Sequence, residues 1–195
     1  MKKHLLLLAL CTSLLLSGRL EAQHYKPARV FRHNQADIWM GYGMFPTYSK
    51  DASRISVPPV SIGLDWMLSD QFSLGASTGY SLYQIEKLWK GDSTVRHYAT
   101  HTLQIMGRAA AHYTRTDNLD IFGGIQVGVQ HVRIRSDEGP FGRIEALHGM
   151  KPNRLRMVYG AYLGVRFAVS RKSTILGEFG TGVSFAQVGW GVKLF

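Results

Sequence analysis

Apolar and polar residues alternate along most of this chain with a period of two. In the segment 72–82, the odd positions carry only serine and glycine, and the even positions carry Phe, Leu, Ala, Thr and Tyr. Strict alternation predicts a β-strand with one apolar and one polar face. The pattern recurs about eight times, and the strands it predicts are 36–45, 57–67, 72–83 or beyond, 95–113, 119–133, 155–169, 174–182 and 185–195.

The connections between these strands alternate in length. Three are tight polar turns, at 68–71, 115–118 and 170–173, and three are longer, at 46–55, 87–94 and 136–153. The last connection, 182–184, is short where a long one is expected. Short turns at one end and longer loops at the other are typical of outer-membrane barrels. We therefore predict an all-β fold, an eight-stranded antiparallel up-and-down transmembrane β-barrel, over residues 35–195.

The composition of the two faces indicates which one meets lipid. The polar face combines very small residues with charges of both signs, which suits the narrow interior of an eight-stranded barrel. Four aromatic residues fall on the apolar face beside the short turns: Trp66, Phe72, Tyr113 and Phe167. We expect them to form an aromatic girdle at one membrane boundary. The alternative is a secreted, lipocalin-like barrel with the same faces reversed.

Residues 1–22 have the features of a cleaved signal peptide. Lys2 and Lys3 precede a short apolar run at 5–16, and the small residue Ala22 precedes a cleavage point at Gln23. The apolar run is shorter than the roughly 20 residues that span a bilayer as a helix. This leader predicts export to the bacterial outer membrane. We expect the polar and basic residues 23–34 to form a periplasmic lead-in to the barrel.

Cleavage leaves one domain with a basic surface. The formal charge changes from +10 to +8, because the leader contains three basic residues and one acidic residue. Cys11 is the only cysteine and lies in the leader, which excludes disulfides and cysteine nucleophiles from the mature chain. A basic exported protein suits phosphate-rich partners, and export favours lipopolysaccharide over nucleic acid. We expect no cofactor.

The chain ends at 189–195 with the sequence Gly-Trp-Gly-Val-Lys-Leu-Phe. With its strand count and loop asymmetry, the chain resembles the small eight-stranded outer-membrane proteins of Gram-negative bacteria, the class that includes the transmembrane domain of outer-membrane protein A. The resemblance covers 36–195 and implies location and architecture rather than activity. In that class a terminal aromatic residue is part of the signal read by the barrel-assembly machinery. Here Phe195 is out of phase with Trp190 and Leu194, unlike the family pattern.

Seven charged residues fall on the polar face: Asp65, Arg108, Asp120, Arg156, Arg166, Glu178 and Lys193, with Asp37 near the strand end. Unpaired charges inside a barrel are costly, so these side chains are expected to pair. We predict an internal salt-bridge network that plugs the lumen. The resemblance agrees, because similar networks occur in the family without an enzymatic role. If these paired side chains separate and open a path through the lumen, the alternative is a small-solute or ion channel.

A further alternative is a lipid A-modifying outer-membrane enzyme. Asp92 and Ser93 are similar in type and place to an Asp-Ser pair of the lipid A palmitoyltransferase, which is also an eight-stranded barrel. That enzyme also uses a loop histidine, and the first loop here, 46–55, contains none. The His-x-Ser motif of the lipid A deacylase is missing as well. Gly-Asp-Ser is ordinary turn chemistry, so no catalytic site is predicted.

His97, His101 and His131 share the apolar phase near the external ends of their strands. His97 and His101 are four residues apart, which is about 13 Å on a strand. They cannot hold one ion together, so no metal site is predicted.

The external end is also strongly basic. Its ten basic residues are Lys50, Arg54, Lys87, Lys90, Arg96, Arg133, Arg135, Arg143, Lys151 and Arg154. Arginine binds phosphate through two parallel hydrogen bonds, and lipopolysaccharide carries phosphates at this depth. The long third loop also contains Phe141 in a Gly-Pro-Phe-Gly turn that suits adhesion. The sequence therefore predicts a structural role in membrane integrity, with external loops that contact lipopolysaccharide or a host surface.

Overall fold

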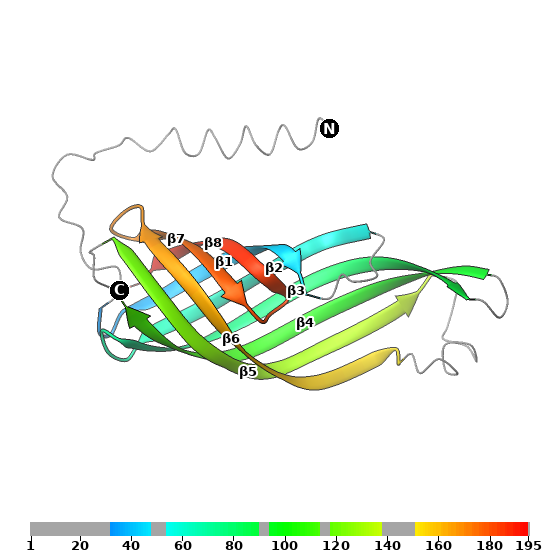
Figure 1. The fold of residues 1–195 in the computed structure, drawn as a ribbon, viewed down its shortest axis with the longest axis horizontal. Helices are drawn as coiled ribbons and strands as arrows, with labels where there is room; N and C mark the ends of the chain where they lie inside the picture. The colour runs from blue at the N-terminus through cyan, green and yellow to red at the C-terminus, as the bar shows by residue number, and fades with distance from the viewer. Residues whose placement is uncertain (1–31, 48–53, 90–93, 114–117, 138–150, 195) are drawn as a thin grey trace, which may run out of the picture.

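Eight antiparallel strands form a closed barrel (Figure 1). The computed structural model describes residues 32–47, 54–89, 94–113, 118–137 and 151–194. Each strand pairs with the next along the chain, and β8 closes the barrel against β1. The strands are β1 Ala36–Pro46, β2 Arg54–Met67, β3 Phe72–Trp89, β4 Thr94–Tyr113, β5 Leu119–Ser136, β6 Asn153–Ala168, β7 Ser173–Gly180 and β8 Ser184–Lys193. The predicted up-and-down barrel is confirmed.

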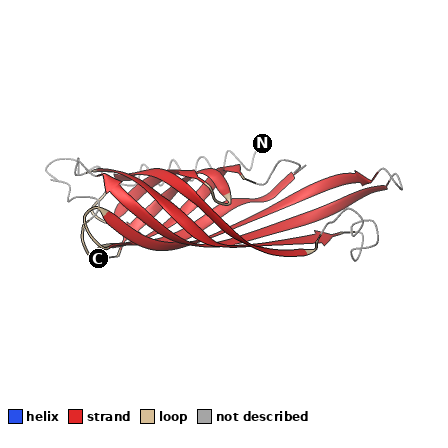
Figure 2. Ribbon diagram, turned by 60° about the horizontal axis from the view of Figure 1, so that its bottom comes forward, coloured by secondary structure: helices blue, strands red, loops and turns tan. Residues whose placement is uncertain are grey.

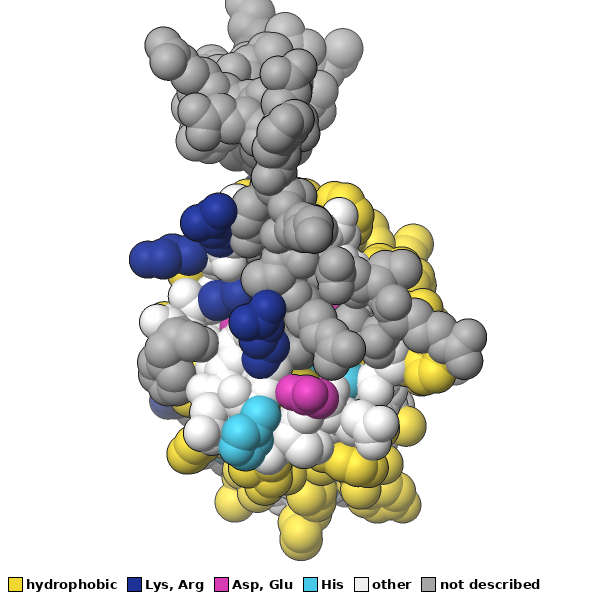
Figure 3. Space-filling model, turned by 90° about the vertical axis from the view of Figure 1, so that its left-hand side faces the viewer, with side chains coloured by type: hydrophobic (Ala, Val, Ile, Leu, Met, Phe, Trp, Pro, Cys, Tyr) yellow, Lys and Arg dark blue, Asp and Glu magenta, His cyan; other side chains and the backbone are white. Residues whose placement is uncertain are grey.

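The apolar face of the strands points outward. Along β4, Leu103 and Ile105 are exposed, whereas their neighbours Thr102, Gln104 and Met106 are buried in the lumen. The same alternation holds on every strand, and Figure 3 shows apolar side chains along the outer wall. A water-soluble barrel would bury this face, so the lipocalin-like alternative is wrong. The chain is a transmembrane barrel of the outer-membrane type. The described residues contain no helix long and apolar enough to cross a membrane.

The barrel wall is much taller on one side than on the other. β3, β4, β5 and β6 contain 18, 20, 18 and 16 residues, whereas β7 and β8 contain 8 and 10. Figure 2 shows one group of strands extending well past the rest. We call the end with the β2–β3, β4–β5 and β6–β7 turns the turn end, and the opposite end the loop end.

Several strands extend further toward the loop end than the sequence predicts. Lys87 pairs with Arg96, although 87–94 was expected to be a loop, and Arg135 pairs with Ala99, although the strand 119–133 was expected to end before it. A strand that has left the hydrocarbon region needs no apolar outer face. The alternation therefore disappears from the sequence while the backbone ladder continues. β7 differs in the other direction, because it ends at Gly180 rather than at 182.

The last residues of the expected lead-in are attached to the turn end. The backbone N–H of His33 donates to Asp70 Oδ1 at 2.9 Å, and that of Asn34 donates to the Met67 carbonyl at 3.0 Å. Asn34 has a φ of 64°, a left-handed conformation that asparagine tolerates better than most residues. The expected signal peptide and the rest of the lead-in lie outside the described residues.

Candidate functional site

Arg166 of β6 joins two carboxylates from the opposite side of the lumen. Its guanidinium is 3.3 Å from Asp37 Oδ2 on β1 and also donates to Asp65 Oδ2 on β2. The indole of Trp39 donates to the same Asp65 oxygen at 2.9 Å. Arg166 is 2% exposed, so its charge is fully removed from water. A buried cation of this kind is tolerable only with such partners.

Arg108 of β4 forms the second half of this network. Its Nη2 donates to Glu178 Oε2 on β7 at 2.5 Å, and its Nε lies 3.9 Å from Asp65 Oδ1. The guanidinium carbon lies 4.1 Å from the Tyr162 ring centroid and 4.8 Å from that of Trp39. The aromatic faces add a cation–π attraction on two sides. Asp65 therefore connects the two arginines.

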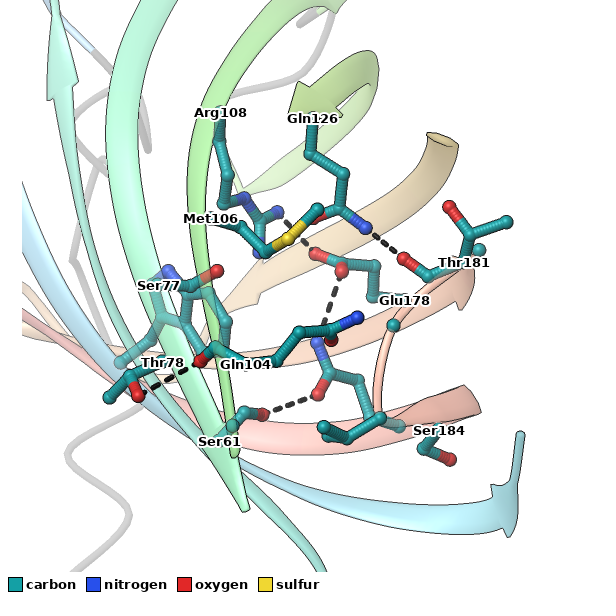
Figure 4. A pocket seen from close by; sticks show the side chains of 16 residues that line it. Ser61, Ser77, Thr78, Gln104, Met106, Arg108, Gln126, Glu178, Thr181 and Ser184 are labelled. Carbon is teal, nitrogen blue, oxygen red and sulfur yellow. Dashed lines mark hydrogen bonds and ion pairs between the residues drawn. The ribbon is translucent and has the colours of Figure 1, made fainter. Parts of the chain in front are cut away.

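Neutral side chains extend the network through further hydrogen bonds, which Figure 4 draws as dashed lines. Gln187 Nε2 donates to Glu178 Oε1 at 3.0 Å, and Ser61 Oγ donates to Gln187 Oε1 at 2.6 Å. A cavity of about 30 Å³, with room for one or two water molecules, lies beside Ser61, Glu178 and Gln187. We call the set Asp37, Asp65, Arg108, Arg166, Glu178, Gln187 and Ser61 the lumen network.

The β7–β8 turn, residues 181–183, lies over the lumen network from the loop end. Its backbone is held by three neighbours: Gln126 Nε2 donates to the Thr181 carbonyl, Thr181 N–H donates to the Ala161 carbonyl, and Thr47 Oγ1 donates to the Gly182 carbonyl. Val183 points inward and is buried. The connection 182–184, which is short where a long loop was expected, therefore helps to fill the lumen.

Two glycines let aromatic rings lie flat against the barrel wall. A Cβ atom at Gly63 would collide with the Trp39 ring, and one at Gly164 would collide with the Phe122 ring. Trp39 and Phe122 are both 2% exposed, and the guanidinium groups of Arg108 and Arg166 lie over their rings. The glycines of the polar face thus leave the space that the large aromatic side chains of the same face occupy.

The seven charged residues predicted from sequence occupy different levels of the barrel. Asp65, Arg108, Arg166 and Glu178 belong to the lumen network, together with Asp37. Asp120 is buried beside His112 and lies opposite Arg166 in the β5–β6 ladder. Arg156 is only partly buried and donates to Gln130 Oε1 at 2.6 Å, nearer the loop end. Lys193 is half-buried at the turn end, where it lies opposite Asp37 in the β1–β8 ladder.

A Ser–His–Asp arrangement at the turn end was missed from the sequence. Ser73 Oγ is 2.8 Å from His112 Nε2, and His112 Nδ1 is 2.8 Å from Asp120 Oδ2. These contacts match the hydrogen bonds of a hydrolase triad. However, all three side chains are buried, and Phe122 stacks on the imidazole with the two ring centroids 5.6 Å apart. The burial of all three side chains argues against access of a substrate to the hydroxyl.

A second, larger cavity of about 390 Å³ lies toward the loop end. Gln104 and Met106 of β4, residues 156–159 of β6 and the β7–β8 turn line it. We call this cavity the upper chamber. The lumen network and the β7–β8 turn separate it from the turn end.

The outer surface carries the other predicted features. Trp66, Phe72, Tyr113 and Phe167 are all about half-exposed on the outer wall, beside the short turns. At the loop end, Arg133 and Arg135 are exposed on the outward phase of β5. Arg133 lies opposite His101, whose Nδ1 is 2.9 Å from the Tyr80 hydroxyl.

Some predicted features lie outside the described residues, namely Lys50, Lys90, Asp92, Ser93, Phe141 and Arg143. Within the part of the chain that the structure describes, no group of three or more His, Cys, Asp or Glu side chains is arranged to hold a metal ion.

No protein-family model matches the chain, and no curated protein sequence matches it either. Several solved structures do. The outer membrane protein OprG from Pseudomonas aeruginosa has a TM-score of 0.53 and 11% identity, over 84% of this chain and 98% of that chain. The attachment invasion locus protein Ail of Yersinia pestis, in complex with the heparin analogue sucrose octasulfate, has a TM-score of 0.48 and 10% identity, over 83% and 95%. Neisserial surface protein A has a TM-score of 0.47 and 12% identity, over 82% and 95%. The likeness to OprG is one of fold, and it agrees with the eight-stranded outer-membrane architecture.

Proposed function

We propose that this protein is a non-enzymatic outer-membrane barrel with a plugged polar lumen, which contributes to membrane integrity and binds lipopolysaccharide at its loop end. The turn end faces the periplasm in this proposal, as short turns do in outer-membrane barrels. The mature chain enters the membrane through the barrel-assembly machinery.

The lumen network is the observation that carries the proposal. Its two arginines connect β4 and β6 to carboxylates on β1, β2 and β7, so the pairs cross the lumen in several directions. A permeating ion would have to displace charge-assisted hydrogen bonds between buried groups, which is costly. The small residual space of about 30 Å³ argues against the channel alternative.

The experiment that tests the plug is ion flux through the purified barrel in lipid vesicles. Vesicles loaded with a potassium-sensitive dye should respond to a potassium gradient as slowly with the protein as without it. Trypsin digestion and heat-dependent gel mobility would establish that the barrel is inserted and folded. Potassium entry in proportion to the amount of folded barrel would support the channel alternative instead.

The loop end supports the lipopolysaccharide part of the proposal. Arg133 and Arg135 project from the outer wall just beyond the apolar belt, next to His101 and His131. Guanidinium groups at that height face the phosphates of an outer leaflet rather than the lumen. The four aromatic residues at the turn end form the opposite boundary of the membrane in this proposal.

The enzyme alternative has no support from a specific observation. Ser73 has the hydrogen-bond partners of a nucleophile but is 5% exposed. Its burial next to His112 and Asp120 suits a structural hydrogen-bonded group at the periplasmic end of the lumen.

A further inference from the structure

The wall of the barrel has an open edge along the outer half of β6. β6 pairs with β5 along its length from Asn153 to Phe167, but with β7 only from Tyr162 to Ala168. β7 ends at Gly180, and Figure 1 shows β6 continuing well past the β7–β8 turn. Among the described residues, no strand pairs with 153–160 on that side. The feature follows from the difference in length between β6, with 16 residues, and β7, with 8.

The direction of the open backbone groups can be read from two hydrogen bonds. Thr181 N–H donates to the Ala161 carbonyl, so the backbone N–H and C=O groups of the odd-numbered residues of β6 point toward β7. Ile134 N–H donates to the Pro152 carbonyl, so the backbone groups of the even-numbered residues point toward β5. Successive residues of an antiparallel strand alternate in this way. The N–H and C=O groups of Leu155, Met157 and Tyr159 therefore point to the open side.

These three residues lie near the outer boundary of the membrane. A tilted strand crosses the hydrocarbon region in about 9–11 residues, and counting from Phe167 at the turn end places that boundary near Met157. Their side chains are outward, with exposures of 69% for Leu155, 76% for Met157 and 85% for Tyr159. Lipid chains cannot satisfy backbone donors and acceptors. Where the edge borders lipid, at Met157 and Tyr159, its backbone groups therefore need a hydrogen-bonding partner.

The surroundings of the edge are basic. Behind it lies the upper chamber, and Arg156 points into that chamber between the outward side chains of Leu155 and Met157. The acidic residues described at the loop ends of β2 to β6 are Glu86 and Asp137, whereas the basic ones are Arg54, Lys87, Arg96, Arg133, Arg135, Lys151, Arg154 and Arg156. This excess of positive charge favours an acidic partner.

We propose that the open edge of β6 binds an extended, acidic segment of a partner protein, which adds to the barrel as an extra strand beside Leu155, Met157 and Tyr159. The backbone ladder supplies the attachment, and the alternate side chains supply the selectivity. Apolar residues of the segment lie outward against Met157 and Tyr159. Its acidic residues lie inward beside Arg156, because directly opposed residues of paired strands share a face.

The inference uses the membrane orientation of the proposed function but not the plug. A conducting barrel would leave the open edge unchanged, and a failure of strand addition would leave the plug unchanged. The flux experiment and the binding experiment therefore fail independently.

The probe is a short fluorescent peptide in which valine and glutamate alternate, and anisotropy measures its binding to the detergent-folded protein. In the predicted register, the valine N–H groups face β6 and the glutamate N–H groups face away. Methylation of the valine nitrogens should therefore weaken binding at least tenfold, whereas methylation of the glutamate nitrogens should not. A peptide with lysine in place of glutamate should bind at least tenfold more weakly than the parent peptide.

Two protein variants localise the site. Met157→Pro removes one N–H from the open edge without removing a β5 ladder bond, and it should weaken binding at least tenfold. Met157→Ala keeps that N–H and removes only the side-chain contact, so it should weaken binding clearly less than Met157→Pro does. Heat-dependent gel mobility reports whether each variant is folded, and the methylated peptides test the proposal on the parent protein alone.

Several outcomes would overturn the inference. They are absence of binding to the parent, equal binding of both methylated peptides, and displacement of the peptide by dodecyl phosphate with no response to nitrogen methylation, which would assign the edge to an anionic lipid. Self-association of the parent that Met157→Pro abolishes would assign the edge to a second copy of this chain, and would overturn it as well.

Discussion

Arg108 on β4 and Glu178 on β7 form an ion pair across the lumen, with Nη2 and Oε2 2.5 Å apart. The two strands are not neighbours in the barrel, so this contact joins opposite walls rather than adjacent strands. Both side chains are buried, and Gln187 holds the second carboxylate oxygen. The pair therefore contributes to the fold and at the same time closes the lumen.

Glu178→Leu should lower the free energy of unfolding by about 3 kcal/mol, because it leaves the buried Arg108 cation without its nearest carboxylate. Urea unfolding in lipid vesicles, followed by tryptophan fluorescence, measures the change. The double variant Arg108→Met with Glu178→Leu is the matched control, because it removes both charges and should recover most of the loss. An unchanged urea midpoint for Glu178→Leu would refute the importance of this pairing.

Gly63→Ala should also destabilise the barrel, by about 1–3 kcal/mol, because the added methyl group collides with the Trp39 ring. Gly107→Ala is the matched control. Its Cβ points outward and lies 3.7 Å from the nearest atom, the Val127 carbonyl oxygen. The same unfolding experiment compares the two. Equal stability of both variants would mean that Trp39 is not packed against Gly63 as described.

Ser73 should not react with a fluorophosphonate probe, although its hydroxyl has the partners of a hydrolase nucleophile. The reason is burial, because the Ser73 side chain is only 5% exposed, between His112 and the rest of the lumen wall. Ser73→Ala should instead cost about 1 kcal/mol of stability through the lost hydrogen bond to His112. Labelling of the folded parent protein that disappears in Ser73→Ala would contradict this view and favour an enzyme.

Replacing Arg133 and Arg135 together by glutamine should weaken binding of lipopolysaccharide by several-fold, because two phosphate-binding guanidinium groups are lost from the outer wall. Replacing Arg171 and Lys172 at the turn end is the control, because it removes the same amount of charge from the opposite boundary. Co-purification with labelled lipopolysaccharide compares the two double variants. Equal losses would indicate a nonspecific effect of net charge.

The membrane-spanning part of the fold could be predicted from sequence because alternation is a local property. The inward position of Gln104 and Arg108 and the outward position of Leu103 and Ile105 follow from parity alone. The loop-end halves of β3 and β5 were harder to predict from the sequence. Lys87 and Arg135 lie where both faces meet water, so no apolar face marks the strand.

Contacts between strands depend on register, which parity does not supply. Asp65 and Arg166 were both assigned to the lumen, but which carboxylate each arginine meets depends on the stagger and tilt of four strands. The proximity of Ser73, His112 and Asp120 has the same origin, because the three residues come from β3, β4 and β5. The open edge of β6 required the end of β7 to be known, and the sequence placed that end two residues too far along.

Single-channel recording in planar bilayers tests the closed lumen most directly. The parent protein should insert without conductance steps, while a variant with Arg108→Ala and Arg166→Ala, which removes both cations of the lumen network, should open ion-conducting steps in the same bilayers. The result expected for a plugged barrel is that the parent shows no current steps and the variant does. Reproducible steps from the folded parent protein would contradict the account and make the barrel a channel.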